Sequence, residues 1–94
     1  MEYPKMARVV FTAHLAEVGP REEERVPGQT VIEALQDIFA RYPRLEGYIL
    51  DDQRRLRKHV AIFIDGVRPP PETVLQQKVG GESEIYVLQA LSGG

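Results

Sequence analysis

The sequence ends in Leu91-Ser92-Gly93-Gly94. The group here that could react is the main-chain carboxylate of Gly94. A free carboxylate is a poor electrophile, whereas an acyl-adenylate made from it with ATP is a good one. Attack on the adenylate by sulfide or a persulfide gives a thiocarboxylate, and attack by an amine gives an isopeptide bond. Gly94 is therefore the candidate for modification in this sequence.

Both reactions require a slim segment that can enter the nucleotide site of a partner. Residues 89–94 span roughly 20 Å when fully extended. Glycine allows the backbone to approach another surface closely because it has no side chain. We therefore expect Leu91, Ser92 and Gly93 to form the part of the tail that enters the partner's active site. The alternative is an ordinary frayed chain end without function.

The rest of the sequence shows no pattern of an internal active site. It has no cysteine, no glycine-rich phosphate loop and no pair of histidines at helical spacing. His14 and His59 are single, and we expect them at the end and the start of strands. Asp51-Asp52 is interpreted as a solvated pair, and Ser92 has no neighbouring general base. We expect no catalytic residue, no metal site and no bound cofactor, so the chain by itself is not predicted to be an enzyme.

One dense basic patch occurs in the segment QRRLRK: Arg54, Arg55, Arg57 and Lys58. Nucleic-acid binding is disfavoured, because the patch lacks interleaved aromatic residues and the whole chain has a net charge of −2. Two interpretations remain, a docking patch for an acidic partner and a solvated loop.

The composition is that of one ordinary globular domain. The chain has 94 residues, of which 43% are hydrophobic and 28% charged. It has no apolar run of membrane-spanning length, and its first residues lack the order of a signal peptide. The absence of cysteine fits a reducing compartment. We therefore expect a cytoplasmic protein that binds neither membranes nor nucleic acid.

Hydrophobic periodicity predicts strands near both ends of the chain and one main helix. Strands are expected within residues 7–15, 22–26, 59–66 and 83–91, with Asp65-Gly66 as a tight turn. The segment from Thr30 to Pro43 is predicted to be a helix, because Thr30 and Glu33 form a capping box and an apolar stripe follows. Residues 43–58 have no clean period and are interpreted as a long irregular connection, with Leu45 tucked inward. A short helical turn is expected within residues 72–79.

This order of elements favours an α+β fold in which a mixed sheet of four to five strands covers one main helix. The first and last strands would lie side by side and parallel at the centre, which is the β-grasp arrangement. A ferredoxin-like fold is the alternative, but it needs two full helices. We expect a β-grasp domain over residues 1–88 and a flexible tail over residues 89–94.

Strand alternation also predicts an apolar face on the side of the sheet that the helix leaves open. Val10, Phe63, Tyr86 and Leu88, with Thr12, are expected to point to this face. Exposed apolar patches on monomers usually mark interfaces, so this face is a candidate docking surface. The alternative is that the long connection covers part of it.

The chain resembles the MoaD/ThiS-type ubiquitin-like sulfur carriers, which are small β-grasp proteins ending in Gly-Gly. The resemblance is carried by RVVFTAHL, TVIEALQDIFARYP, HVAIFIDGV and GGESEIYVLQALSGG, in the family's order. Within the family, LRKHVAIFIDG looks most like the carrier for cysteine synthesis, although molybdopterin-type carriers are similar. The run of three prolines at residues 69–71 is unusual.

The resemblance implies that an E1-like activating enzyme, using ATP, adenylates Gly94 and docks on the open sheet face. The resulting thiocarboxylate would pass its sulfur to a biosynthetic enzyme. Two other functions stay open: a modifier joined to lysines through Gly94, and a β-grasp binding module with an inert tail. The pathway that would receive the sulfur also stays open among cysteine, molybdenum cofactor, thiamine and tRNA thiolation.

Overall fold

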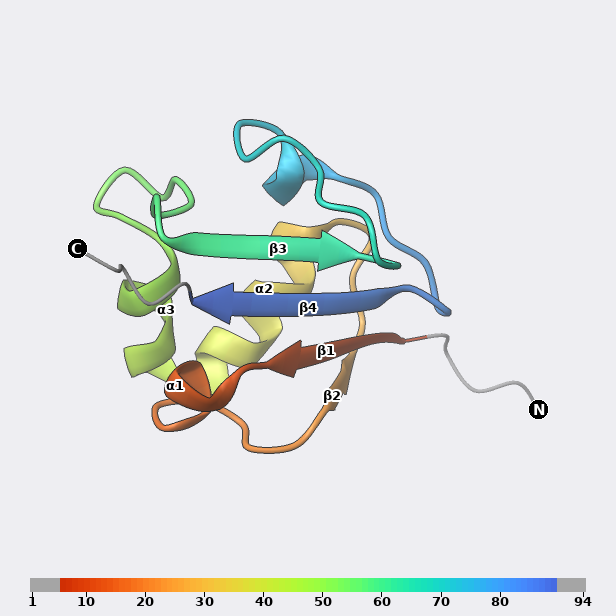
Figure 1. The fold of residues 1–94 in the computed structure, drawn as a ribbon. Helices are drawn as coiled ribbons and strands as arrows, with labels where there is room; N and C mark the ends of the chain where they lie inside the picture. The colour runs from red at the N-terminus through yellow and green to blue at the C-terminus, as the bar shows by residue number, and fades with distance from the viewer. Residues whose placement is uncertain (1–5, 90–94) are drawn as a thin grey trace.

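The protein is described by a computed structural model that covers residues 6–89, with the two ends of the chain left out of the description. Its centre is a four-stranded sheet in the order β2-β1-β4-β3 (Figure 1). The first and last strands are parallel neighbours in the middle, and each has an antiparallel strand on its other side. The strands are β1 (Ala7–Phe11), β2 (Glu24–Val26), β3 (Val60–Ile64) and β4 (Glu84–Gln89). The predicted β-grasp arrangement is confirmed, with four strands.

The main helix, α2 (Val31–Arg41), begins where the capping residues predict. The hydroxyl of Thr30 accepts a hydrogen bond from the backbone N–H of Glu33 at 3.3 Å. The Glu33 side chain accepts from the backbone N–H of Gln29 at 2.7 Å, one residue earlier than in an ideal capping box. One stripe of the helix packs on the sheet: Val31, Ala34, Leu35, Ile38 and Phe39 are all buried.

Two further helices correct the sequence interpretation. The segment after α2 is not wholly irregular, because α3 (Pro43–Ile49) follows directly. Pro43 ends one helix and occupies the first turn of the next, where its missing N–H costs nothing. Leu45 is fully buried, as predicted. The first predicted strand is also shorter than expected, since it ends at Phe11 and a short helix, α1 (Ala13–Ala16), follows.

The inner face of the sheet forms the core with α2 and α3. Side chains of the strands alternate, and the inward ones are buried: Ala7, Val9 and Phe11 on β1, Val60, Ile62 and Ile64 on β3, and Ile85 and Val87 on β4. The prediction of which residues of these three strands face the core is therefore confirmed. Figure 1 shows α2 behind the sheet, so the opposite face points toward the viewer.

The segment that follows β3 lies along the outer edge of that strand. Asp65 and Gly66, with φ values of 52° and 83°, form the predicted tight turn, and Val67 then bonds back to Ile64. The prolines at residues 69–71 are outside any strand, and a single turn of 3₁₀ helix, η1 (Val74–Gln76), follows as predicted. Ile64 and Val67 form an isolated antiparallel bridge at this edge of β3. Within residues 6–89, no helix has the length and apolar character needed to cross a membrane.

Candidate functional site

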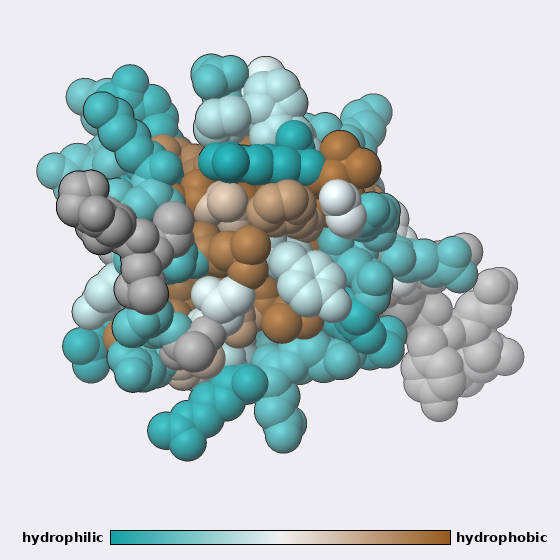
Figure 2. Space-filling view, viewed as in Figure 1, coloured by the Kyte–Doolittle hydropathy of each residue, from teal (hydrophilic) through white to brown (hydrophobic). Residues whose placement is uncertain are grey.

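The predicted docking residues lie together on the sheet face that α2 leaves open. Val10 and Phe63 stand opposite Tyr86 in the two strand registers, and Leu88 is the next residue on the same face of β4. Tyr86 is 37% exposed, and Val10, Phe63 and Leu88 are half-buried. Figure 2 shows apolar and neutral residues across the middle of this face and hydrophilic residues around them. Docking of a partner at this surface stays a prediction, and we call Val10, Phe63, Tyr86 and Leu88 the docking face after that predicted role.

A charged cluster borders the docking face at the start of β1. The guanidinium of Arg8 forms ion pairs with Glu84 and, at 3.5 Å, with Glu23, and it donates to the Tyr86 hydroxyl at 3.3 Å. Burial works against the charge, but the Tyr86 hydrogen bond and the two carboxylates raise the pKa of Arg8 above its ordinary value. Arg8 thus connects Tyr86, at the centre of the face, to two carboxylates.

The strand that leads to the predicted tail is the central strand β4. Of the residues 89–94, the structure describes only Gln89, which is the last residue of β4 and stands opposite Val60 on β3. Leu91, Ser92, Gly93 and Gly94 lie outside the described residues, so their role remains a prediction.

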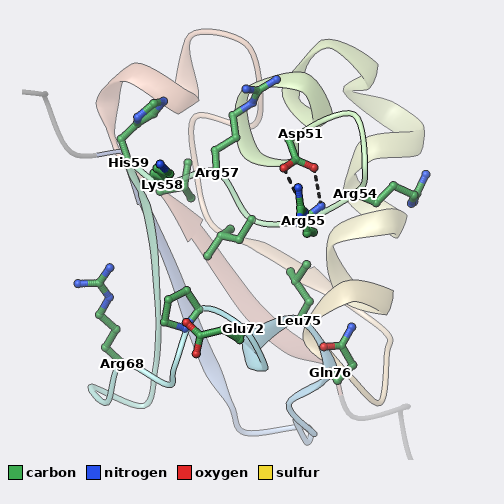
Figure 3. Close-up of a pocket in the computed structure, with 13 residues that line it drawn as sticks. Asp51, Arg54, Arg55, Arg57, Lys58, His59, Arg68, Glu72, Leu75 and Gln76 are labelled. Carbon is green, nitrogen blue, oxygen red and sulfur yellow. Dashed lines mark hydrogen bonds and ion pairs between the residues drawn. The ribbon is translucent and has the colours of Figure 1, made fainter.

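The predicted basic patch lines one side of an open hollow of about 780 Å³. Arg54, Arg55, Arg57 and Lys58 come from the connection between α3 and β3, and Arg68 comes from the segment after β3 (Figure 3). Leu56 and Leu75 supply apolar surface between them. We call this hollow the basic groove. It belongs to the edge of β3 and shares none of its lining residues with the docking face.

Asp51 holds the connection that carries these cations. Its Oδ1 accepts from the backbone N–H groups of Gln53 and Arg55, both at 2.9 Å. The hydrogen bond from the Arg55 backbone is the main reason that the pKa of Asp51 lies below its ordinary value. Arg54 adopts the left-handed conformation with φ of 62° and pairs with Glu46 at 3.3 Å. The connection is therefore a tight hydrogen-bonded turn.

The remaining candidates occupy separate places. His14 lies in α1 instead of at a strand end, because β1 stops at Phe11, and its side chain is exposed. His59 lies in the turn just before β3 instead of starting the strand, because β3 begins at Val60, and it lines the basic groove. Asp52 is exposed, whereas Asp51 has the turn-closing contacts described above. No group of three or more histidine, aspartate or glutamate side chains within residues 6–89 is placed to hold a metal ion.

Comparison with known proteins gives structural likeness over nearly the whole chain. No family model and no curated protein sequence matches it. SAMP1 from Haloferax volcanii superimposes with a TM-score of 0.79 at 25% identity, over 94% of this chain and 98% of that one. The small archaeal modifier protein 1 from Methanosarcina acetivorans gives 0.80 at 25% identity, over 99% and 100%.

A chain of the Amycolatopsis orientalis BexX/CysO complex gives a TM-score of 0.82 at 18% identity, over 94% of this chain and 99% of that one. The chain is a ubiquitin-like β-grasp protein. The resemblance to the MoaD/ThiS-type proteins that its sequence indicates is thereby confirmed in the structure. In this ubiquitin-like protein the docking face and the strand leading to Gly94 belong to one central sheet.

Sequence reasoning missed two residues of this ubiquitin-like protein. Arg8 lies on the same outward face of β1 as Val10. The strand alternation that predicted the position of Val10 could therefore have predicted Arg8 at the border of the docking face. Arg68 had no such signal, because it follows β3 in a proline-rich segment whose path across the strand edge no local pattern predicts.

Proposed function

We propose that this protein is a sulfur carrier whose Gly94 carboxylate is adenylated by an E1-like enzyme, at the expense of ATP, and converted to a thiocarboxylate. The protein then acts as a cosubstrate that delivers sulfur to a biosynthetic enzyme. The observation that carries the proposal is the near-complete structural overlap with ubiquitin-like proteins, together with the Gly93-Gly94 sequence that follows the central strand.

The fold supports this chemistry because the surface that a partner would bind is separate from the group that would react. The docking face presents Tyr86 and Phe63 on a sheet anchored by α2, so a partner can bind it without disturbing the core. Gly94 follows Gln89 by five residues, and five extended residues span about 17 Å. That reach lets an enzyme docked on the sheet receive the carboxylate in its nucleotide site.

A second function, transfer of the activated acyl group to lysines of other proteins, shares every step up to the adenylate. It is favoured by the 25% identity to two proteins named SAMP1, a small archaeal modifier protein. The two functions differ in the acceptor, which is sulfide or persulfide in one and an amine in the other.

The deciding experiment is intact-mass analysis of the protein recovered from its own cells with an N-terminal tag. A form heavier by the replacement of one oxygen with sulfur, located in the last peptide, supports the carrier. Branched peptides that join Gly94 to lysines support the modifier. A single unmodified mass, unchanged by ATP, a sulfur donor and the candidate activating enzyme, contradicts both and leaves a binding module. Deletion of Gly93 and Gly94 is the control, and it should abolish either product.

A further inference from the structure

We propose that the basic groove is a second docking site, which binds an extended acidic peptide segment of a partner protein with an apolar side chain between its carboxylates. The groove lies at the edge of β3 and its lining includes neither Phe63 nor Tyr86. The proposal rests on this groove alone and does not depend on the chemistry at Gly94.

The groove has two walls, from segments that precede and follow β3 in the sequence. One wall is the tight turn that Asp51 closes, and its cations are Arg54, Arg55, Arg57 and Lys58. The other wall is the segment between β3 and η1, from which Arg68 projects. Figure 3 shows the two walls facing each other across the hollow, with Arg68 on the opposite side from Arg55 and Arg54.

The charge of the groove is opposite to that of the whole protein. Five basic side chains and two acidic ones, Asp51 and Glu72, line it, which gives a net charge of +3 where the chain carries −2. Asp51 is already engaged by the backbone N–H groups of its own turn. Among the ion pairs of the described residues, none involves Lys58 or Arg68. These two cations therefore remain available to carboxylates of a partner.

The distribution of the cations favours a peptide over a single phosphate group. Arg54 is held toward Glu46 at 3.3 Å, and Arg57 donates from Nε to the backbone oxygen of Gly47 at 2.8 Å. Figure 3 shows the side chains of Arg54, Arg57 and Arg68 pointing in different directions. Cations spread in this way match several carboxylates along a segment, whereas a phosphate site requires them to converge on one point.

The apolar part of the groove adds a second requirement for the ligand. Leu56 is half-buried and packs against the core, and Leu75 is 6% exposed. Both line the hollow between the charged walls. An apolar side chain flanked by acidic ones would satisfy both surfaces. Nucleic acid fits less well, because no phenylalanine, tyrosine or tryptophan lines the groove for base stacking.

The test measures binding of a fluorescein-labelled peptide that alternates glutamate with leucine, by fluorescence anisotropy with the full chain. We expect the variant Lys58→Glu/Arg68→Glu to bind about tenfold more weakly, which corresponds to about 1.4 kcal/mol. The matched control is Arg21→Glu/Arg25→Glu, which makes the same change of charge at exposed positions by β2, on the far edge of the sheet. It should bind within about twofold of the wild-type chain. Amide NMR shifts should concentrate in residues 51–59, 68 and 72–76.

Three outcomes would overturn the proposal. Equal weakening by the two double variants would show attraction to overall charge alone. A peptide with serine in place of leucine that binds as tightly, and is displaced by inorganic phosphate, would show a plain anion site. A single-stranded RNA oligonucleotide that binds more tightly than the peptide would show a nucleic-acid site.

Discussion

Arg8 and Tyr86 are joined across the two central strands, because Nη2 of Arg8 on β1 donates to the hydroxyl of Tyr86 on β4 at 3.3 Å. The Nε atom of Arg8 is buried and has no hydrogen-bond partner among the described residues. The pairing of Arg8 with Glu23 and Glu84 fixes this guanidinium at one border of the docking face. Tyr86 is therefore oriented by a charge, in addition to its packing between Val10 and Phe63.

The first prediction concerns this orientation. Replacing Arg8 with alanine should release the Tyr86 ring and weaken binding of the proposed activating enzyme several-fold, because the hydrogen bond to the Tyr86 hydroxyl and the ion pairs to Glu23 and Glu84 are lost. Tyr86→Phe keeps the ring but removes the same hydrogen bond, so it should weaken binding in the same direction. Calorimetric titration with the enzyme, with NMR of the Tyr86 ring, measures both effects. Wild-type affinity for Arg8→Ala would show that Arg8 is only a solubilising charge.

A second prediction tests the docking face itself. Phe63→Asp places a charge opposite Tyr86 in the register and should strongly reduce activation by the proposed E1-like enzyme. The domain should stay folded, because the Phe63 side chain faces away from the core. Circular dichroism and an ATP–pyrophosphate exchange assay with the activating enzyme separate the two effects. Gln36→Asp, an exposed position on α2, is the control. Loss of the folded spectrum in Phe63→Asp alone would contradict the placement of this residue.

A third prediction compares two glycines. Gly28 has a φ of 152°, and a Cβ there would lie 2.9 Å from the backbone nitrogen of Ala34 in α2. Gly28→Ala should therefore lower the free energy of unfolding by about 1–3 kcal/mol. Gly47 lies within α3 and has open space around it, so Gly47→Ala should raise the free energy of unfolding by roughly 0.5–1 kcal/mol. Urea denaturation measures both, and changes of the same sign would refute the argument.

The fourth prediction follows from the lowered pKa of Asp51. A carboxyl whose pKa is lower in the folded state contributes its stabilisation fully above its unfolded pKa of about 3.9. That contribution disappears as the pH falls through the folded pKa. The turn should therefore stay closed at neutral pH and open in acid below about pH 4. The amide signals of Gln53 and Arg55 should report this opening in an NMR titration.

Asp51→Ala serves as the reference for that titration. It removes the acceptor of the two amides at every pH, so the turn should be open at neutral pH and the acid transition should vanish. The basic groove should lose affinity for its peptide in the same variant, because the turn positions Arg54 and Arg55. An unchanged acid transition in Asp51→Ala would assign it to another carboxyl group.

The sequence predicted those parts of the fold that a local pattern specifies. The start of α2 followed from Thr30 and Glu33, and the docking face followed from alternation along β1, β3 and β4. The helix α3 escaped prediction for a physical reason. Pro43 is a stop signal for the preceding helix and equally a start signal for the next, and Gly47 inside α3 lowers its helical propensity.

The basic groove was likewise predictable only in part from the sequence. The cations of residues 54–58 are adjacent in sequence and were visible as a patch, but the groove needs Arg68 and Leu75 as well. These residues reach the patch only because the chain turns at Asp65-Gly66 and returns along the edge of β3. Contact between these two segments depends on the tertiary structure. The residue pattern within either segment does not predict it.

The position of β4 has a consequence for how the chain is made. β4 is the last strand in sequence and a central strand in the sheet, and Arg8 meets Glu84 across a separation of 76 residues. On the ribosome, β1 has only β2 as a neighbour until residues 84–89 emerge, and contacts so distant in sequence form slowly. A chain cut short within β4 would therefore lack the strand that joins β1 to β3, and neither of these strands would have its full set of neighbours.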